Sequence, residues 1–373
     1  MPSKTRTSKK KRRRKQPPQP PRPKAKAMAK NAFSALVSSV RRDVDARLES
    51  FLDGKVQALS AHGPEVVDLA AAVRDLCLRG GKRTRAALLV AGYRAASSTA
   101  PFEPALDAGV ALELLHAYLL IHDDWMDEDT VRRGGPAVHA ALSKKLRSKR
   151  LGERSGILAG DLAQAFATEA LTRVQVSPSR LAKVLESFAQ MQVDAVAGQH
   201  LDVLGRTRDV EKVYELKTSS YTVRGPLRVG AQLAGGSQKL LTTLDGFAAP
   251  VGVAFQLRDD LLSAFGDPAQ TGKPFGSDLR SGKHTVLLTI ALKRARGRDH
   301  RRLRAVVGNP KATHAQLEQA IEVIERSGAR EAVEQRIDEL SQAAIAALRE
   351  GRVSAEGLAM LEGATRALTS RLS

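Results

Sequence analysis

Apolar residues recur along most of the chain at the spacing of one helix face. They fall at positions i, i+3, i+4 and i+7 in several segments from about residue 32 onward, for example over Leu317–Ile324 and Val333–Ala344. Alternation of apolar and polar residues, the pattern of a strand, is rare, and aromatic residues make up only 4% of the 373 residues. Glycine and proline clusters such as Gly308-Asn309-Pro310 separate the helical segments. The pattern predicts an all-α fold.

The beginning of the chain has a different composition. Residues 1–30 contain thirteen Lys and Arg side chains, no acidic one, and a proline-rich stretch over residues 17–23. Such a segment lacks the apolar residues that a core needs, so we predict a disordered tail over residues 1–31 and a folded region over residues 32–373. A solvated extension, nuclear targeting, contact with RNA or another polyanion, and adhesion to an anionic membrane are all compatible with it.

The tail accounts for most of the excess positive charge. The whole chain carries +20, whereas residues 31–373 hold 47 basic and 40 acidic side chains, a net charge of +7. The folded region therefore has no general need of a nucleic-acid partner.

Cysteine use and hydropathy bear on the compartment. Cys77 is the one cysteine, so neither an internal disulfide nor a cysteine-based zinc site can form, and a reducing compartment fits. The basic N-terminus is not followed by the apolar core of a secretory signal, and no run of about 18 apolar residues predicts a membrane span. We expect a cytoplasmic protein without an integral membrane segment.

The segment from Val110 to Arg133 combines an apolar helical run with acidic residues at its end. Asp123 and Asp127 are one turn apart, separated by about 40° on a helical wheel, and His116 falls near the same direction. An acidic, solvated helix end is the ordinary explanation for this spacing. Carboxylates that end a buried helix repel each other unless a cation compensates them, and oxygen ligands with open positions suit Mg²⁺ bridging to a phosphate.

A second acidic pair, Asp259-Asp260, also follows an apolar segment, so a divided metal site is expected. Basic residues that could hold a diphosphate lie around the two clusters. They are Lys82, Arg83, Arg85, Arg132, Arg133, Lys217, Lys273 and Lys283. Each of them alone could be ordinary surface charge.

The order of these motifs resembles the trans-type isoprenyl diphosphate synthases, also called polyprenyl synthetases. The series that carries the resemblance is Gly80-Gly81-Lys82-Arg83-Thr84-Arg85, Asp123-Asp124-Trp125-Met126-Asp127, Arg132-Arg133-Gly134, Lys217-Thr218 and Gln256 before Asp259-Asp260. The resemblance extends from about residue 32 to the C-terminus, which it makes the catalytic domain. It implies a bundle of antiparallel helices around a central active-site cavity, in a homodimer.

The resemblance also implies a role for each matching residue. Asp123, Asp127 and Asp259 would bind Mg²⁺, three ions in each active site. The allylic diphosphate would be held by Arg132, Lys217, Thr218, Gln256, Lys273 and Lys283. Isopentenyl diphosphate would be held by Lys82, Arg85, His116 and Arg133. The chain departs from the family at Ser263, which stands where many members carry the last aspartate of the second motif, so the ligands of the third ion are less defined.

The family's chemistry is the addition of isopentenyl diphosphate to an allylic cation, which forms when the allylic diphosphate departs. Catalysis would rest on Asp123, Asp127, Lys217, Thr218, Gln256 and Asp259. Product length is usually set just upstream of the first aspartate motif, here at Tyr118 and Leu119, and a large residue at the first of these resembles the geranylgeranyl diphosphate synthases. The helical wheel places Leu119, not Tyr118, on the Asp123 face, so farnesyl or longer products stay open.

Two other classes remain as alternatives. A class I terpene cyclase shares the helical bundle and an aspartate motif, but needs no isopentenyl diphosphate site. A non-catalytic protein acting through its basic tail would bind polyanions and lack condensation activity.

Overall fold

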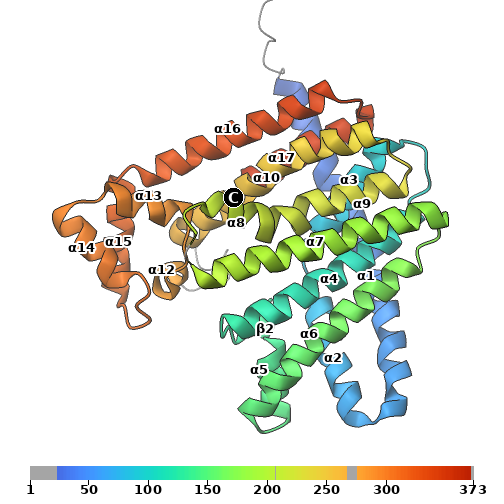
Figure 1. The fold of residues 1–373 in the computed structure, drawn as a ribbon, viewed down its shortest axis with the longest axis horizontal. Helices are drawn as coiled ribbons and strands as arrows, with labels where there is room; N and C mark the ends of the chain where they lie inside the picture. The colour runs from blue at the N-terminus through green and yellow to red at the C-terminus, as the bar shows by residue number, and fades with distance from the viewer. Residues whose placement is uncertain (1–22, 206, 267–274, 371–373) are drawn as a thin grey trace, which may run out of the picture.

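Helices form nearly all of the protein. The structure, a computed structural model, describes residues 23–205, 207–266 and 275–370. The longer helices are α1 (Pro23–Leu59), α2 (Pro64–Leu78), α3 (Thr84–Ala96), α4 (Glu103–Met126), α6 (Lys149–Thr172), α7 (Pro178–Leu204), α10 (Gln238–Phe265), α15 (His314–Arg326), α16 (Ala329–Glu350) and α17 (Ala355–Thr369). They pack as one bundle, with α13–α15 gathered at one end (Figure 1).

Shorter elements connect these helices. They are η1 (Ser60–His62), α5 (Val138–Lys145), α8 (Val210–Val213), α9 (Gly225–Leu233), α12 (Ser277–Ser281), α13 (Val286–Arg294) and α14 (Gly297–Val306), together with the π-helix η2 (Tyr214–Arg224). Strands β1 (Val131–Arg132) and β2 (Gly135–Pro136) form a small antiparallel hairpin, the one sheet within the described ranges. The all-α prediction is confirmed.

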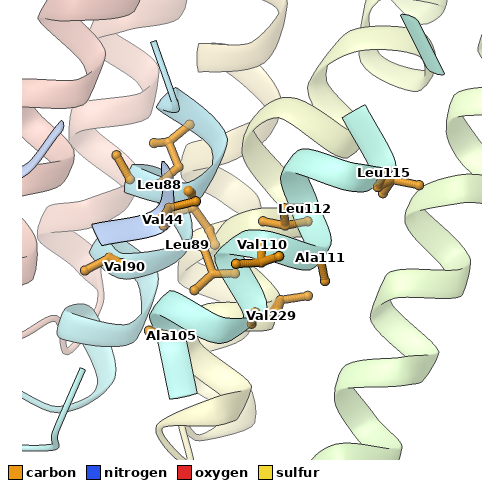
Figure 2. Close-up of a cluster of buried hydrophobic side chains, with 14 of the residues drawn as sticks. Val44, Leu88, Leu89, Val90, Ala105, Val110, Ala111, Leu112, Leu115 and Val229 are labelled. Carbon is orange, nitrogen blue, oxygen red and sulfur yellow. The ribbon is translucent and has the colours of Figure 1, made fainter. Parts of the chain in front are cut away.

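The main core lies where α1, α3, α4 and α9 cross. Figure 2 shows Val44, Leu88, Leu112 and Val229 from these four helices meeting in one cluster of buried side chains. Each large side chain buried in this way stabilises the fold by about 1.5–3 kcal/mol. A second cluster joins the C-terminal half of α10 to α13–α16. The two clusters hold the ends of α4 and α10, which carry the two aspartate motifs.

The predicted tail is too long at its C-terminal side. Helix α1 begins at Pro23, within the range predicted to be disordered. Proline suits the first turn of a helix, and the residues 24–29 are Ala, Lys and Met, which are strong helix formers. Residues 1–22, which contain the basic run, lie outside the described residues, so the prediction of disorder there remains a prediction.

Helices α4 and α10 are long and apolar enough to cross a membrane by length and composition. Their most apolar windows reach a mean hydropathy of 1.4 and 1.3, which the sequence analysis, expecting no such span, did not anticipate. The windows are 67% and 61% buried inside the protein. A helix that is apolar on most sides is what the centre of a helical bundle requires, so the core accounts for their composition.

Candidate active site

The first aspartate motif lies at the C-terminal end of α4. Asp123 is in the last turn and Asp127 is the C-cap residue. Asp124, between them, is buried and accepts a hydrogen bond of 2.6 Å from Nε of Arg132. Burial raises the pKa of Asp124 to about 6, although the ion pair with Arg132 opposes this rise. Asp124 and Arg132 therefore form a structural pair, whereas Asp123 and Asp127 remain for a ligand.

The hairpin after α4 positions two consecutive arginines. Arg133 and Gly134 both have positive φ, 51° and 71°, the conformation of a type I′ turn. Arg132 points to Asp124 and Asp129 on the aspartate side. Arg133 instead donates to the carbonyl of Leu76 at 3.2 Å, on the other side. The turn thus separates two side chains that are adjacent in sequence.

Lys217 and Thr218 lie in the π-helix η2, whose wider turns are frequent at functional sites. Glycines let the neighbouring helices approach this segment closely. A Cβ at Gly198 of α7 would lie 2.2 Å from the backbone nitrogen of Lys217, and a Cβ at Gly252 of α10 would lie 2.6 Å from Cα of Ser219. The π-helix is therefore held between α7 and α10 on either side of Thr218, at Lys217 and Ser219.

Lys217 joins η2 to the first aspartate motif. Its Nζ lies 2.6 Å from Oδ2 of Asp202 and 3.4 Å from Oδ1 of Asp123. Burial lowers the pKa of Lys217, but Asp123 and Asp202 outweigh burial, and the net pKa is raised. Gln199 also donates to Oδ1 of Asp123, at 3.0 Å. Asp123 is thus oriented by an ammonium group and an amide.

The second aspartate motif, at the end of α10, is tied to the same π-helix. Thr218 donates to Oε1 of Gln256 at 2.8 Å, and Nε2 of Gln256 donates to Asp260 at 3.0 Å. Tyr214 donates to the other oxygen of Asp260 and accepts from the backbone of Val286 at 3.0 Å. Burial raises the pKa of Asp260 to about 6, despite the opposing effects of Lys283, Tyr214 and Gln256.

These contacts distinguish the two aspartates of the second motif. Asp260 is buried and its two oxygens accept bonds from Tyr214 and Gln256, whereas Asp259 is half-buried. The geometry therefore favours Asp259 as the metal-facing carboxylate. Ser263 is half-buried, and its buried hydroxyl oxygen has no hydrogen-bond partner among the described residues.

Lys283 faces both motifs. Burial lowers its pKa, but Asp260, Asp278, Asp202 and Asp123 together raise the pKa well above the ordinary lysine value. A single ammonium group thus lies within electrostatic range of carboxylates from α4, α7 and α10. Lys273 lies outside the described residues.

A separate cationic pocket is formed by Arg85 of α3, His116 of α4 and Arg133. The guanidinium groups lie 3.3 Å and 3.5 Å from Nδ1 of His116. Burial, Arg85 and Arg133 hold the pKa of His116 well below its ordinary value, so the ring is neutral at pH 7. Neither arginine pairs with a described carboxylate, and the buried Nε of Arg85 has no described partner. Two such guanidinium groups suit an anion.

The neighbouring basic residues differ in their surroundings. Lys82 is exposed at the rim. Arg83 is buried, and its guanidinium binds Glu113 at 2.9 Å, Asp45 at 2.6 Å and the carbonyl of Cys77 at 2.8 Å. Arg83 is among the cations predicted to hold a diphosphate, but its donors are used to join α1, α3 and α4.

An apolar cavity of about 330 Å³ opens beneath Asp123 and Lys217. Both candidate chain-length residues, Tyr118 and Leu119, line it, so the helical wheel did not decide between them. The ring of Tyr118 packs edge-on against His122, with centroids 4.9 Å apart. Tyr221 lines the same cavity and also stacks under Arg85, with 4.5 Å from the guanidinium carbon to the ring centroid. Tyr221 thus lies between the cavity and the cationic pocket.

The carboxylates fit a magnesium ion that is shared with a phosphate. In the part of the chain that the structure describes, no group of three or more His, Cys, Asp or Glu side chains could hold a metal by itself. Burial and the nearby Asp123 raise the pKa of Asp127, so the ionised carboxylate is destabilised. A bound divalent cation would compensate this destabilisation. Mg²⁺ commonly takes one or two carboxylates and completes its shell with water and substrate phosphates, which matches this donor set.

Several residues that complete the site carry no role in the sequence prediction, although Gly198-Gln199 and Asp202 belong to the motifs that resemble the family. Gln199 and Asp202, which orient Asp123 and Lys217, follow Gly198, the glycine of α7 that contacts η2. Tyr221 follows Thr218 by three residues. Tyr214 gave no signal in the sequence, because its partner Asp260 is 46 positions away.

Comparison with known proteins agrees with this geometry. The family model described as polyprenyl synthetase matches residues 67–324. The chain belongs to the polyprenyl synthetase family. The family match confirms the resemblance found in the motifs and identifies the chain as an enzyme of the trans-prenyltransferase class.

Individual polyprenyl synthetases are similar over most of their length. The crystal structure of geranylgeranyl pyrophosphate synthase from Corynebacterium glutamicum, complexed with isoprenyl diphosphate and magnesium, has 36% identity and a TM-score of 0.84, covering 91% of this chain and 99% of that chain. Geranylgeranyl diphosphate synthase of Methanosarcina mazei is 32% identical over 76% of this chain and 82% of its own. Farnesyl diphosphate synthase of Geobacillus stearothermophilus is 35% identical over 57% of this chain and 72% of its own.

Proposed function

We propose that this polyprenyl synthetase condenses isopentenyl diphosphate with an allylic diphosphate, head to tail and in the trans geometry, giving a short-chain polyprenyl diphosphate and pyrophosphate. The observation that carries this proposal is the arrangement of two anion sites around one apolar cavity. Asp123 and Lys217 stand at the cavity mouth, and the cationic pocket of Arg85, His116 and Arg133 lies beyond Tyr221. Two diphosphates can thus be held while an apolar chain fills the cavity.

The residues of the first site would hold the leaving diphosphate. Bound Mg²⁺, three ions in each site, would supply Lewis-acid stabilisation of the charge that develops on its oxygens. Asp123, Asp127 and Asp259 are the carboxylates placed to hold these ions. Lys217 and Lys283 supply fixed positive charge. Thr218 orients Gln256, whose amide has a second N–H for the diphosphate, so the diphosphate is stabilised as it departs.

The second site would position the nucleophile. Arg85 and Arg133 hold the diphosphate of isopentenyl diphosphate, and Nδ1 of neutral His116 lies within 3.5 Å of both guanidinium groups. The exposed Lys82 would add a further positive charge. The double bond is then close to the allylic cation, which lowers the entropic part of the barrier. The apolar cavity wall excludes water, which would otherwise convert the cation to an alcohol.

Purified protein incubated with Mg²⁺, isopentenyl diphosphate and each allylic primer in turn tests the proposal. Chromatography should show a product five carbons longer than the primer, with pyrophosphate released. The same incubation without isopentenyl diphosphate is the control. Hydrocarbon formed in that control would indicate a terpene cyclase, and no product in either would leave only the non-catalytic alternative.

Arg85→Gln is expected to raise the KM for isopentenyl diphosphate by about ten- to a hundredfold, because one charge-assisted anion contact is lost. The KM for the allylic primer should change less than twofold, since Arg85 lies in the cationic pocket and not at the aspartates. Steady-state kinetics with each substrate varied separately measures the two constants. Arg298→Gln, exposed on α14 and outside the pocket, is a control for a general loss of positive charge. Equal increases in both KM values would contradict the assignment.

Geranylgeranyl diphosphate is the product that we propose. Tyr118 lines the cavity and presents a large ring, and both structural and sequence relatives are named for this product. A farnesyl diphosphate synthase is similar at comparable identity, so the C15 product and longer products remain the alternatives for the assay.

Tyr118→Ala is expected to lengthen the product, because removing the ring extends a cavity that the growing chain fills. Leu119→Ala should have a smaller effect, since leucine is the smaller side chain. Product chromatography with farnesyl diphosphate as primer gives the chain-length distribution. Met360→Ala, buried in the core outside this cavity, is the matched control for a cavity-forming change. An unchanged product from Tyr118→Ala would exclude this residue as the limit.

We also propose a homodimer formed through α6 and α7. These two helices expose a row of large apolar side chains that includes Leu158, Val193 and Val196. Exposed apolar surface of this kind is typical of a subunit interface. Light scattering should give twice the mass of one chain, and Val193→Lys should reduce it to that of a monomer.

The cytoplasm is the compartment that we propose. The single cysteine, Cys77, is buried and free, as expected in a reducing environment. The basic tail would add contact with a polyanion or an anionic membrane, a property separate from the chemistry.

A further inference from the structure

The end of α5, the turn after it and the beginning of α6, residues 144–154, form a projecting tip that nothing in the proposed reaction uses. It lies at the lower edge of the molecule in Figure 1, on a short helical hairpin. The tip combines two exposed leucines with six basic residues. We propose that the α5–α6 tip docks this enzyme on the surface of an anionic lipid bilayer.

The two leucines are exposed because the hairpin holds them outward. Leu146 is the C-cap residue of α5 and Leu151 lies in the first turn of α6, with 37% and 46% of their surfaces exposed. Helices α5 and α6 pack so closely that a Cβ at Gly152 would lie 2.3 Å from Cα of Ser143. The turn between them cannot fold the leucines back into a core. They therefore remain available to enter the boundary between headgroups and acyl chains.

The basic residues around these leucines are largely without acidic partners. Lys145 pairs with Asp68, and Lys149 with Glu153 at 3.6 Å. The other four, Lys144, Arg147, Arg150 and Arg154, are exposed and make no ion pair with a described residue. Four free cations beside an apolar pair are complementary to anionic headgroups above an apolar layer, and each basic side chain near such a surface adds to the attraction.

Helix α14 carries a basic surface without exposed large apolar side chains, and so serves as a comparison for the tip. Arg298, Arg301 and Arg304 are exposed on it, but no large hydrophobic side chain of α13–α15 is exposed. Such a surface can attract any polyanion. The tip differs by its leucines, which gain nothing from a nucleic-acid backbone but gain burial in a bilayer. The observations therefore favour a membrane over a nucleic acid.

The expected product gives a further reason, which rests on the proposed function. A polyprenyl diphosphate has a long apolar chain and a charged head, so it partitions into bilayers. An enzyme held at the bilayer surface would release its product into the phase where the product is soluble. The exposure of the two leucines and the positive charge of the tip do not depend on this reaction.

A fluorescent label at the tip tests the proposal. Leu146→Cys introduces an exposed thiol, whereas Cys77 is buried, so an environment-sensitive fluorophore reacts at position 146. On addition of phosphatidylcholine vesicles that contain phosphatidylserine, the emission should shift to the blue. Vesicles of phosphatidylcholine alone should give no shift. The matched control, Arg301→Cys on α14, should show no shift with either vesicle.

The label separates the tip from the basic tail, because a tail contact cannot bury position 146. Vesicle binding without a shift at position 146, or an equal shift at positions 146 and 301, would overturn the proposal. A shift with a duplex oligonucleotide as large as that with vesicles would also overturn it. Light scattering of Leu151→Ser decides whether Leu151 belongs to the dimer interface: conversion to a monomer with unchanged vesicle affinity would remove this residue from the tip.

Charge variants give a quantitative comparison. The triple variant Lys144→Gln, Arg147→Gln, Arg150→Gln should weaken vesicle binding about a hundredfold, and Arg298→Gln, Arg301→Gln, Arg304→Gln less than twofold. Equal losses would contradict a specific tip. Condensation in solution without vesicles should be unchanged in both variants. Failure of vesicle docking with intact condensation would therefore overturn this proposal alone, whereas absent condensation in the unmodified protein would overturn the proposed function.

Discussion

Asp123→Asn is expected to lower kcat by at least about a thousandfold, because it removes a carboxylate that we propose to hold Mg²⁺ against the departing diphosphate. Asp123 is also the point where Lys217 and Gln199 converge on the first motif. The affinity for isopentenyl diphosphate should change little, since this substrate is assigned to Arg85 and Arg133. Steady-state kinetics gives kcat, and calorimetric titration with isopentenyl diphosphate gives the dissociation constant.

Asp161→Asn serves as the control for Asp123→Asn. Asp161 lies on α6 near His122 and is mostly exposed. Its substitution removes the same charge as Asp123→Asn without changing the motif. It should retain nearly full turnover. Equal losses of turnover and isopentenyl diphosphate binding in Asp123→Asn would contradict the separation of the two sites.

Gly198→Ala is expected to lower kcat about a hundredfold although it changes no chemical group. The added Cβ would lie 2.2 Å from the nitrogen and 2.6 Å from Cα of Lys217, so α7 and η2 must move apart. Displacement of a catalytic group by about 1 Å can cost two orders of magnitude in rate. The overpacking should also lower the free energy of unfolding by about 1–3 kcal/mol, measured by denaturant titration.

Gly246→Ala is the matched control for Gly198→Ala. It lies within α10, and its added Cβ would meet Ala347 at 3.5 Å, an ordinary contact. Alanine in a helix interior should raise stability by up to about 1 kcal/mol and leave activity unchanged. If Gly198→Ala retained full turnover, the π-helix would not require its close contact with α7.

The local sequence predicts the features that depend on residues near one another. The apolar stripes predict the helices, and the spacing of Asp123 and Asp127 predicts their common face at the end of α4. The grouping of Arg85, His116 and Arg133 followed from the motif order, and the structure brings the three together. A resemblance over the whole chain was needed for this, since the three residues lie on separate elements.

Features that depend on distant contacts could not be predicted. Arg83 has the same chemistry as Arg85, but only the folded chain shows that Asp45 and Glu113 occupy its donors. The π-helix around Lys217 has no local pattern of its own, because the close packing at Gly198 and Gly252 involves α7 and α10. Residues 24–30 were assigned to the tail because of their charge, although alanine and lysine favour a helix.

The hairpin after α4 couples the positions of the two proposed substrate sites. Arg132 contacts the aspartate side and Arg133 contacts His116, so one peptide unit spans the boundary between the two sites. Arg133 has a φ of 51°, a conformation that costs free energy in a residue other than glycine and persists because the fold imposes it. An insertion or deletion in this turn would displace both arginines and so change the distance between the two diphosphates. The length of the turn should therefore be much less free to vary during evolution than that of the other surface loops.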